Sequence, residues 1–220
     1  MERIMTKNPD FLEMFRSAAS SGNITLGECS FTKKEYIFRQ GDEGSGVHIV
    51  ISGLVKSSML SENGKDTMVA LFGPGEPMGE LEFFLKEPML CSVFALENVR
   101  TLYADHATMS RLLKVSAGLG SAFAGVLASR LKRSSLRMQT ALVFPLEYNL
   151  LKAIITRFDS PFIEGSAIHK SELAEYLGGT ERHLNRILRE LAEQGVITLS
   201  GANITAVNKS KARSIIQAWV

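Results

Sequence analysis

The stretch that decides the fold is Ile168–Ile197, which reads IHKSELAEYLGGTERHLNRILRELAEQGVI. Its second half carries apolar residues at the i, i+3, i+4 and i+7 spacing of a helix that is buried along one face: Leu184, Ile187, Leu188 and Leu191. A shorter apolar pattern precedes them, and Gly178-Gly179 interrupts the two. Thr180 follows these glycines, where its hydroxyl can accept a hydrogen bond from the first turn of the second helix. The stretch therefore predicts a helix, a tight turn and a second helix.

The residues that follow this stretch separate two interpretations of it. A helical hairpin with a charged, solvated outer face is the commoner structure for such a pattern. Here, however, Val196–Leu199 is typical of a strand, Ser200–Ala202 of a tight turn and Asn203–Val207 of a returning strand. Asn208 can cap a last helix that runs to Trp219. The combination favours a winged helix-turn-helix.

The polar face of the second helix has the chemistry of a DNA-reading surface. Arginine and asparagine end in planar groups whose donors and acceptors match the edges of guanine and adenine in the major groove. We expect DNA to be bound through Thr180, Glu181, Arg182, Asn185, Arg186 and Arg189. Thr180 and Arg189 are expected to contact phosphates, which position a protein on DNA without reading its sequence.

The composition describes an ordinary packed protein with little global charge. The 220 residues suffice for two modest domains, 45% of them are hydrophobic, and the net charge is only +2. Any positive charge that meets DNA must therefore be local. Two basic runs satisfy this requirement: Arg130, Lys132, Arg133 and Arg137, and then Lys209, Lys211 and Arg213. Because basic runs are more often solvated faces, they are weak evidence by themselves.

Several classes of protein are disfavoured. No apolar run is long enough to cross a bilayer, and Asp10 and Glu13 interrupt any signal-peptide pattern near the N-terminus. Two cysteines, Cys29 and Cys91, are too few for a disulfide framework or a metal site. The sequence predicts a cytoplasmic protein with no metal, no cofactor and no membrane contact.

Residues 24–104 have the texture of an all-β domain, after a helix expected over residues 1–22. Short β-rich runs alternate with turn signals, and the expected strands are 35–38, 47–51, 54–60, 66–72, 91–96 and 100–104. Asn63-Gly64 lies between two of them and is the strongest short hairpin signal, in which both turn residues take positive φ. The recurrent glycines at 41, 53, 64, 75 and 79 predict a barrel or sandwich with a corner after each strand.

Beyond Asp105 the pattern is helical, with helices expected over residues 105–114, 117–142 and 146–158. The second helix ends before Pro145, because proline disfavours helix in the residue before it. Its residues at alternating spacings of 4 and 3 form a coiled-coil seam: Gly120, Ala124, Leu127, Leu131, Ser134, Met138 and Ala141. Packing on the chain's own β domain is the alternative use of this stripe. We expect a mixed role, and the seam favours a parallel dimer.

A β-roll followed by a long helix and a winged helix-turn-helix resembles the Crp/Fnr family of bacterial transcription regulators. Gly75–Leu81, GEPMGEL, resembles the family's phosphate-binding cassette, and Phe38–Asp42, FRQGD, resembles the turn after its first strands. Glu172–Ile197 resembles its helix-turn-helix signature. Phe144-Pro145-Leu146 and Arg182-His183-Leu184 are similar to the YeiL-type branch of the family.

The resemblance implies an α+β chain in three parts. A β-roll effector domain of the cyclic-nucleotide-binding kind, with its N-terminal helix, is expected over residues 1–115. A dimerisation helix should follow over residues 116–143, and a winged helix-turn-helix DNA-binding domain over residues 144–220. The implied protein is a homodimeric transcription regulator that binds a palindromic operator in double-stranded DNA. An unknown small-molecule effector gates it, unless it is constitutively active, and RNA polymerase is a partner if it is an activator.

The resemblance also implies an effector pocket, which maps to Gly79, Glu80, Leu81, Leu90, Cys91, Ser134 and Ser135. In members that bind cyclic AMP, an Arg-Ser pair holds the cyclic phosphate, and its positions fall on Leu90 and Cys91. Leucine cannot pair with a buried phosphate, whose burial without a charged partner is costly. Cyclic AMP is therefore not the expected effector. Ser134 and Ser135 match an adenine-contacting pair, although two small residues in a helix interface are the preferred interpretation.

Other effectors of the family fit no better. An iron–sulfur sensor needs four ligands, and the cysteines are too few. His48 lies in an apolar run, where a hydrogen-bonded structural role is preferred over a haem ligand. Cys91 would need a lowered pKa and some exposure to act as a redox switch. A small buried residue is the preferred interpretation of Cys91, because free cysteines are among the most buried residues.

Three positions of the recognition helix read bases in many members of the family, and they fall on Glu181, Arg182 and Arg186. Arg186 keeps the family's arginine and is expected to read guanine. Arg182 stands where a glutamate is usual, so the half-site should differ from the family's. Asn185 is expected to add an adenine contact.

Two rival functions are weaker. A cyclic-nucleotide-binding module that acts through protein partners would need neither the winged unit nor Leu90 in place of an arginine. An enzyme would need a reactive constellation, and the sequence offers no nucleophile–base pair, metal triad or phosphate-binding loop of the Walker type.

Overall fold

The computed structural model describes residues 5–158, 168–178 and 180–219. They form two compact units, residues 5–131 and residues 132–219, and the division falls inside the long helix α4 (Ala117–Val143). Each unit has a hydrophobic core of its own. The sequence also predicts a loop, with Pro161, over residues 159–165, and this segment lies outside the described residues.

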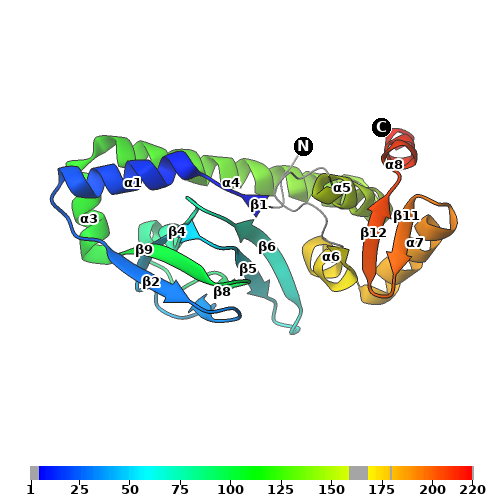
Figure 1. The fold of residues 1–220 in the computed structure, drawn as a ribbon, viewed down its shortest axis with the longest axis horizontal. Helices are drawn as coiled ribbons and strands as arrows, with labels where there is room; N and C mark the ends of the chain where they lie inside the picture. The colour runs from blue at the N-terminus through cyan, green and yellow to red at the C-terminus, as the bar shows by residue number, and fades with distance from the viewer. Residues whose placement is uncertain (1–4, 159–167, 179, 220) are drawn as a thin grey trace. The chain divides into compact units, whose positions relative to one another are not determined.

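The N-terminal unit contains two β-sheets that form the expected β-roll (Figure 1). One sheet has the strand order β1-β6-β5-β8-β3 and the other has the order β2-β9-β4-β7. The first consists, in that order, of Met5–Thr6, Asp66–Phe72, Val55–Leu60, Ser92–Ala95 and Tyr36–Phe38. The second consists of Gly27–Phe31, Val99–Asp105, Gly46–Ser52 and Pro77–Met78. Neighbouring strands are antiparallel, apart from the parallel pair β1–β6.

The expected strands correspond to β3, β4, β5, β6, β8 and β9 within a few residues, but three short strands were not expected. β2 reads GECSF and is mostly exposed, so no apolar alternation marks it in the sequence. The helix expected from residue 1 was wrong at its start, because β1 precedes it and α1 covers only Pro9–Ser21. Asn8 caps α1 by accepting a hydrogen bond from the Phe11 amide at 3.3 Å. Pro9 fits the first turn, where its missing N–H costs nothing.

The hairpin between β5 and β6 forms, but not with the expected turn. Gly64 has a φ of 79°, whereas Asn63 is not among the residues with positive φ. The Gly64 amide donates to Ser61 O at 2.9 Å, and the Ser61 amide donates to Lys65 O at 3.0 Å. A longer loop therefore closes on one left-handed glycine, which relieves Asn63 of the strained conformation that a two-residue turn demands.

Helices α1, α3 (His106–Val115) and the first half of α4 pack against the strands β4 and β9. Phe11, Phe15 and Phe123 are almost completely buried in this core, and the rings of Phe11 and Phe123 meet edge to face at 4.9 Å. Among the described residues, no single helix has the length and hydropathy to span a membrane, and only α3 and α4 taken together, with a 114° bend between them, pass on those two properties.

His48 is a structural histidine, as expected. It lies on β4, is 5% exposed, and its Nδ1 is 2.9 Å from the hydroxyl of Thr101 on β9. The rings of Phe31, Phe38 and Tyr103 surround it. Burial in this apolar site lowers the pKa of His48 to about 4.

This pKa predicts a loss of stability in mild acid. Between about pH 6.5 and 4 the unfolded chain binds a proton at His48, whereas the folded chain does not. As the pH is lowered through this range, the free energy of unfolding should therefore decrease by about 3 kcal/mol. Urea unfolding of the wild type and of His48→Gln should therefore show a smaller acid-induced loss in the variant. Equal losses in both proteins would contradict the prediction.

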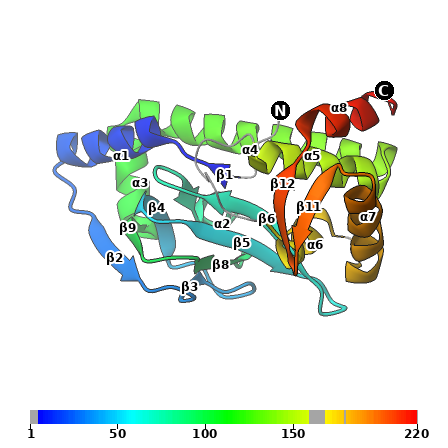
Figure 2. The same cartoon turned by 45° about the vertical axis from the view of Figure 1, so that its right-hand side comes forward.

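The C-terminal unit is the expected winged helix-turn-helix (Figure 2). It contains, in chain order, α5 (Leu146–Phe158), β10 (Ile168–His169), α6 (Lys170–Leu177), α7 (Glu181–Glu193), β11 (Ile197–Ser200), β12 (Asn203–Val207) and α8 (Lys209–Gln217). The wing is a sheet of order β10-β12-β11, whose strand β10 was not expected because it has two residues. Asn208 caps α8 as expected, with a hydrogen bond of 3.1 Å from the Lys211 amide.

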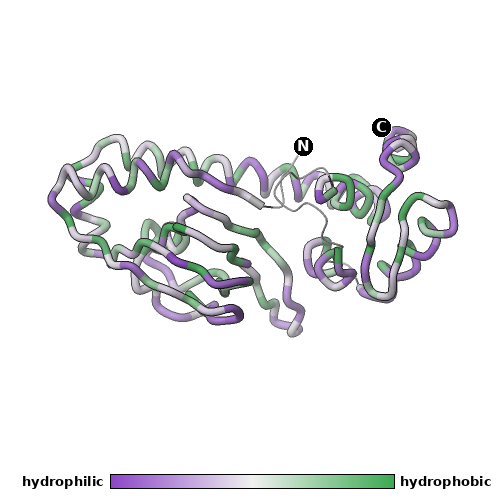
Figure 3. The backbone as a smooth tube through the Cα atoms, in the orientation of Figure 1, coloured by the Kyte–Doolittle hydropathy of each residue, from purple (hydrophilic) through white to green (hydrophobic). Residues whose placement is uncertain are grey.

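Hydrophobic and hydrophilic residues alternate along α4 (Figure 3). Burial divides the residues of interest into two stripes. One stripe, which we call the inner stripe, consists of Leu119, Phe123, Val126 and Arg130 and contributes its apolar members to the N-terminal core. The first four seam residues, Gly120, Ala124, Leu127 and Leu131, each follow an inner-stripe residue by one position. Leu131 and Met138 of the seam are 69% and 61% exposed. The expected mixed role was therefore assigned to the wrong residues, since the inner stripe packs on the β domain and the seam remains largely open.

Candidate functional site

The helix α7 begins as the sequence predicted. The Thr180 hydroxyl accepts a hydrogen bond from the His183 amide at 3.3 Å, and Gly178 ends α6 with a φ of 68°. Leu184 and Leu188 are buried, at 1% and 0% exposure. The residues expected to bind DNA are all exposed: Thr180, Glu181, Arg182, Asn185, Arg186 and Arg189. Four of them recur at the i, i+3, i+4 and i+7 spacing and therefore lie on one side of α7: Arg182, Asn185, Arg186 and Arg189.

A hollow of about 370 Å³ lies beside the first turn of α7. Glu181 and Asn185 line it from α7, His169 and Lys170 from the start of α6, and the turn 201–202 from the wing. The sequence did not indicate this grouping, because His169 is an unexpected helix cap whose Nδ1 is 2.7 Å from the hydroxyl of Ser171. The hollow adds polar groups of α6 and the wing to the exposed face of α7.

Arg186 already has a partner within its own helix. Its Nη1 donates a hydrogen bond to Glu190 Oε1 at 2.7 Å, one helical turn further on. Both side chains are largely exposed. Glu190 was not among the residues expected to act in DNA binding.

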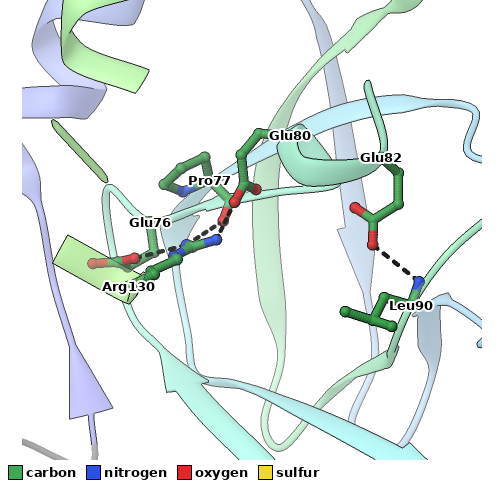
Figure 4. A network of polar contacts seen from close by, with 6 residues as sticks. All are labelled: Glu76, Pro77, Glu80, Glu82, Leu90 and Arg130. Carbon is green, nitrogen blue, oxygen red and sulfur yellow. Dashed lines mark hydrogen bonds and ion pairs between the residues drawn. The ribbon is translucent and has the colours of Figure 1, made fainter. Parts of the chain in front are cut away.

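Two arginines of the first basic run, Arg130 and Arg137, make structural contacts, so the run does not act as a whole as local charge for DNA. Arg130 points into the β-roll (Figure 4), and Arg137 donates to the Tyr176 carbonyl at 2.5 Å with its guanidinium 4.5 Å from that ring. These arginines therefore satisfy structural acceptors inside their own units. In the second run, Lys211 donates to the Gln194 carbonyl at 3.0 Å.

The cassette and α2 (Glu80–Leu85) place buried carboxylates around Arg130 (Figure 4). The guanidinium donates to Glu80, to Glu76 Oε2 at 3.0 Å and to the Pro77 carbonyl at 2.8 Å. Glu76 and Glu80 are only 5% and 2% exposed. The ring of Phe72 lies 4.5 Å from the guanidinium carbon. In this network, which we call the Arg130 network, one guanidinium is shared between two buried carboxylates.

Burial raises the pKa of Glu80, and the charge of Arg130 opposes that shift. Gly79 precedes Glu80 with a φ of 81°, and a Cβ there would lie 2.5 Å from the Gly46 carbonyl oxygen. Glycine is therefore required to bring the cassette this close to β4.

Glu82 is a residue of this pocket that the sequence did not indicate. Its side chain is buried, and its Oε1 accepts a hydrogen bond from the Leu90 amide at 3.0 Å (Figure 4). The Leu90 side chain is 53% exposed. The Glu82 carboxylate therefore accepts the hydrogen bond of the Leu90 amide, at the position where the family resemblance places the phosphate anchor.

The other expected pocket residues divide into two groups. Cys91 adjoins this carboxylate, and burial, which is partly opposed by a hydrogen bond with Ser57, raises the pKa of its thiol. A raised pKa disfavours the reactive thiolate that a redox switch needs. Cys91 is only half-buried, however, so the expectation of a buried residue was wrong in that respect. Ser134 and Ser135 are exposed on α4 and belong to the C-terminal compact unit.

Comparisons with known proteins agree with both halves of the fold. A cyclic nucleotide-binding domain model matches residues 28–116, and a Crp-like helix-turn-helix domain model matches residues 160–211. A CRP-like cAMP-activated global transcriptional regulator of Mycobacterium tuberculosis is 24% identical over 93% of this chain and 94% of its own length. The cyclic AMP receptor protein of Thermus thermophilus is 29% identical over 76% of this chain and 78% of its own.

Solved structures share the fold. The c-di-GMP-responsive global regulator CLP of Xanthomonas campestris superposes with a TM-score of 0.78 at 16% identity, over 91% of this chain and 100% of that chain. A Crp/Fnr-family transcriptional regulator of Thermus thermophilus superposes with a TM-score of 0.69 at 21% identity, over 87% of this chain and 98% of that chain.

These relatives match along most of their own length and are regulators rather than enzymes. The helix-turn-helix domain means that the protein binds DNA. With a cyclic-nucleotide-binding domain and a Crp-like helix-turn-helix in one chain, the protein belongs to the Crp/Fnr family of transcription regulators.

Proposed function

We propose that the chain acts as a homodimer on a palindromic DNA operator. In this proposal residues 1–115 form the effector domain, residues 116–143 the dimerisation helix and residues 144–220 the DNA-binding domain. The observation that carries the proposal is the single exposed side of α7 on which Arg182, Asn185, Arg186 and Arg189 lie together. RNA polymerase is a partner if the protein activates transcription. The regulator itself would act in the cytoplasm.

The seam of α4 supports the dimer. Leu131 and Met138 are 69% and 61% exposed, although apolar side chains of this size are usually buried. Spacing of 4 and 3 residues is the repeat by which parallel helices interlock. A second copy of the same helix presents the same stripe, so the two stripes would cover each other about a two-fold axis.

The reading of bases follows from the exposed side of α7. Arg186 would donate to guanine O6 and N7, and Asn185 would pair with adenine. Arg182 would donate where the family resemblance places an accepting glutamate. Thr180, at the start of α7, and Arg189 would contact phosphates.

The pocket makes an anionic effector such as cyclic AMP unfavourable. Glu76, Glu80 and Glu82 are buried there, Glu82 already holds the Leu90 amide, and Arg130 is shared between two carboxylates. A phosphate would meet negative charge where it needs a cation. Arg130 Nε is buried and has no hydrogen-bond partner within the described residues, so a neutral ligand with an acceptor group fits better.

Selection from a random duplex pool tests the proposed DNA function. The purified protein should enrich a palindrome whose half-sites are about one helical turn, roughly 10 base pairs, apart. Arg186→Ala should then lose about 1–3 kcal/mol of discrimination at one guanine. Arg189→Ala, the matched arginine, should weaken binding to all sequences alike and reduce its salt dependence. If nothing is enriched and binding is indifferent to salt, the protein is not a sequence-specific DNA reader in this state.

Cyclic AMP should not stabilise the wild-type protein. A ligand that binds only the folded state raises the melting temperature with concentration. We expect no saturable rise with cyclic AMP and no binding heat in calorimetry, whereas the cAMP-activated relative from Mycobacterium tuberculosis, run in parallel, should show both. Saturable binding of cyclic AMP by this chain would show that the pocket accepts an anion after all.

A further inference from the structure

The ion pair between Arg186 and Glu190 restricts the residue that is proposed to read guanine. An arginine on an exposed helix face samples many rotamers, and holding it in one of them costs conformational entropy. The bond of 2.7 Å to Glu190 Oε1 uses Nη1 of Arg186. It selects, before DNA arrives, rotamers in which the guanidinium lies beside the next turn of α7.

The geometry of the guanidinium leaves a complete reading edge. Arginine has five N–H groups in a planar fork, and a guanine contact takes two parallel donors from one edge. Since Glu190 takes a hydrogen from Nη1, the pair Nε and Nη2 remains for O6 and N7 of the base. One carboxylate therefore orients the guanidinium without consuming the donors that read the base.

Glu190 places a negative charge on the side of α7 that is proposed to face DNA. A carboxylate near the phosphates of DNA lowers affinity, because it repels the backbone that positive residues attract. An exposed i, i+4 pair contributes little to the stability of the free helix. Neither affinity nor stability explains a glutamate one turn after Arg186, whereas orientation of that arginine does.

We propose that Glu190 is a positioning residue that sets the specificity of Arg186 for guanine. The inference rests on the proposed reading of guanine by Arg186. Glu190 itself contacts no base in this proposal, so its removal should reduce discrimination between operators while it raises affinity for unrelated DNA.

The experiment measures binding of the wild type, Glu190→Ala, Glu190→Gln and Arg186→Ala to the selected operator and to operators with each guanine replaced. Glu190→Ala should reduce discrimination at the Arg186 guanine about twofold, the factor that corresponds to the roughly 0.3–0.5 kcal/mol of an exposed i, i+4 pair. Glu190→Gln keeps an acceptor and should retain most of the discrimination. The matched control is Glu193→Ala, which removes an equal charge from an exposed position of the same helix. It should raise affinity for all sequences and leave discrimination intact.

The double variant Arg186→Ala/Glu190→Ala tests whether Glu190 acts through Arg186. If Glu190 acts through Arg186, then Glu190→Ala should have no further effect on discrimination in the Arg186→Ala background. The same loss in both backgrounds, or full discrimination by Glu190→Ala alone, would overturn the role of Glu190 and leave the proposed function standing. If Arg186→Ala discriminates as well as the wild type at every guanine, the proposed reading by Arg186 fails, and the role of Glu190 fails with it.

Discussion

Arg130→Ala is expected to lower the free energy of unfolding by about 3–5 kcal/mol, the usual cost of removing one partner of a buried ion pair. Glu76 and Glu80 are 5% and 2% exposed, so water cannot replace the guanidinium that they lose. Urea unfolding at neutral pH measures the loss. Lys132→Ala removes the same charge from an exposed position two residues away and should change stability by less than about 0.5 kcal/mol.

The loss caused by Arg130→Ala should also depend on pH. The pKa of Glu80 is raised in the folded protein, and without Arg130 the opposing influence disappears, so the pKa should rise further. A carboxyl whose folded pKa lies above its unfolded pKa favours folding at low pH and disfavours it as the pH rises through the folded value. The difference between variant and wild type should therefore be smaller in mild acid than at neutral pH. A second change, Glu80→Gln, should recover part of the loss, and no recovery would argue against the Arg130 network.

Leu131→Glu is expected to dissociate the proposed dimer and to reduce operator affinity by about a hundredfold or more. A glutamate at this seam position would face its own copy across the two-fold axis, where like charges and a buried carboxylate are both unfavourable. A monomer keeps one recognition helix and therefore loses the benefit of binding two half-sites at once. Sedimentation measures the oligomeric state, and titration of the palindromic operator measures the affinity.

Gln139→Glu is the matched control for Leu131→Glu. It introduces the same charge on α4, at an exposed position outside the seam and the inner stripe, with almost no change of shape. It should sediment and bind as the wild type does. If Leu131→Glu remains a dimer with wild-type affinity, a surface other than the seam holds the two copies together.

The periodic segments of the fold could be predicted from the sequence because burial imposes a period on them. The four buried apolar residues and the Thr180 cap place α7 correctly, since a helix buried along one stripe repeats its apolar residues every three or four positions. Short strands such as β7 and β10 have two residues each and leave no period to detect. β2 was not predicted, because its mostly exposed residues show no alternation of apolar and polar side chains.

The pocket was harder to predict because its contacts join residues far apart in the chain. Arg130 lies 50 residues from Glu80, and the sequence placed it in a basic run that suggested an outward role. Glu82 follows Glu80 by two residues, yet only the folded loop brings the Leu90 amide to it. By contrast, Leu90 in place of an arginine was visible in the sequence, because a missing charge depends on residue identity and not on geometry.

The two stripes of α4 constrain how this helix can change during evolution. Each residue turns an α-helix by about 100°, so inserting one residue near Val126 would rotate everything beyond it by that angle. Arg130 would no longer lie on the same side of α4 as Phe123. The seam residues beyond the insertion would likewise no longer lie on the same side as Gly120 and Ala124. Substitutions at exposed positions of α4 outside the seam should accumulate freely among descendants of this gene. Insertions and deletions should survive only in lengths close to seven residues, which restore both stripes at once.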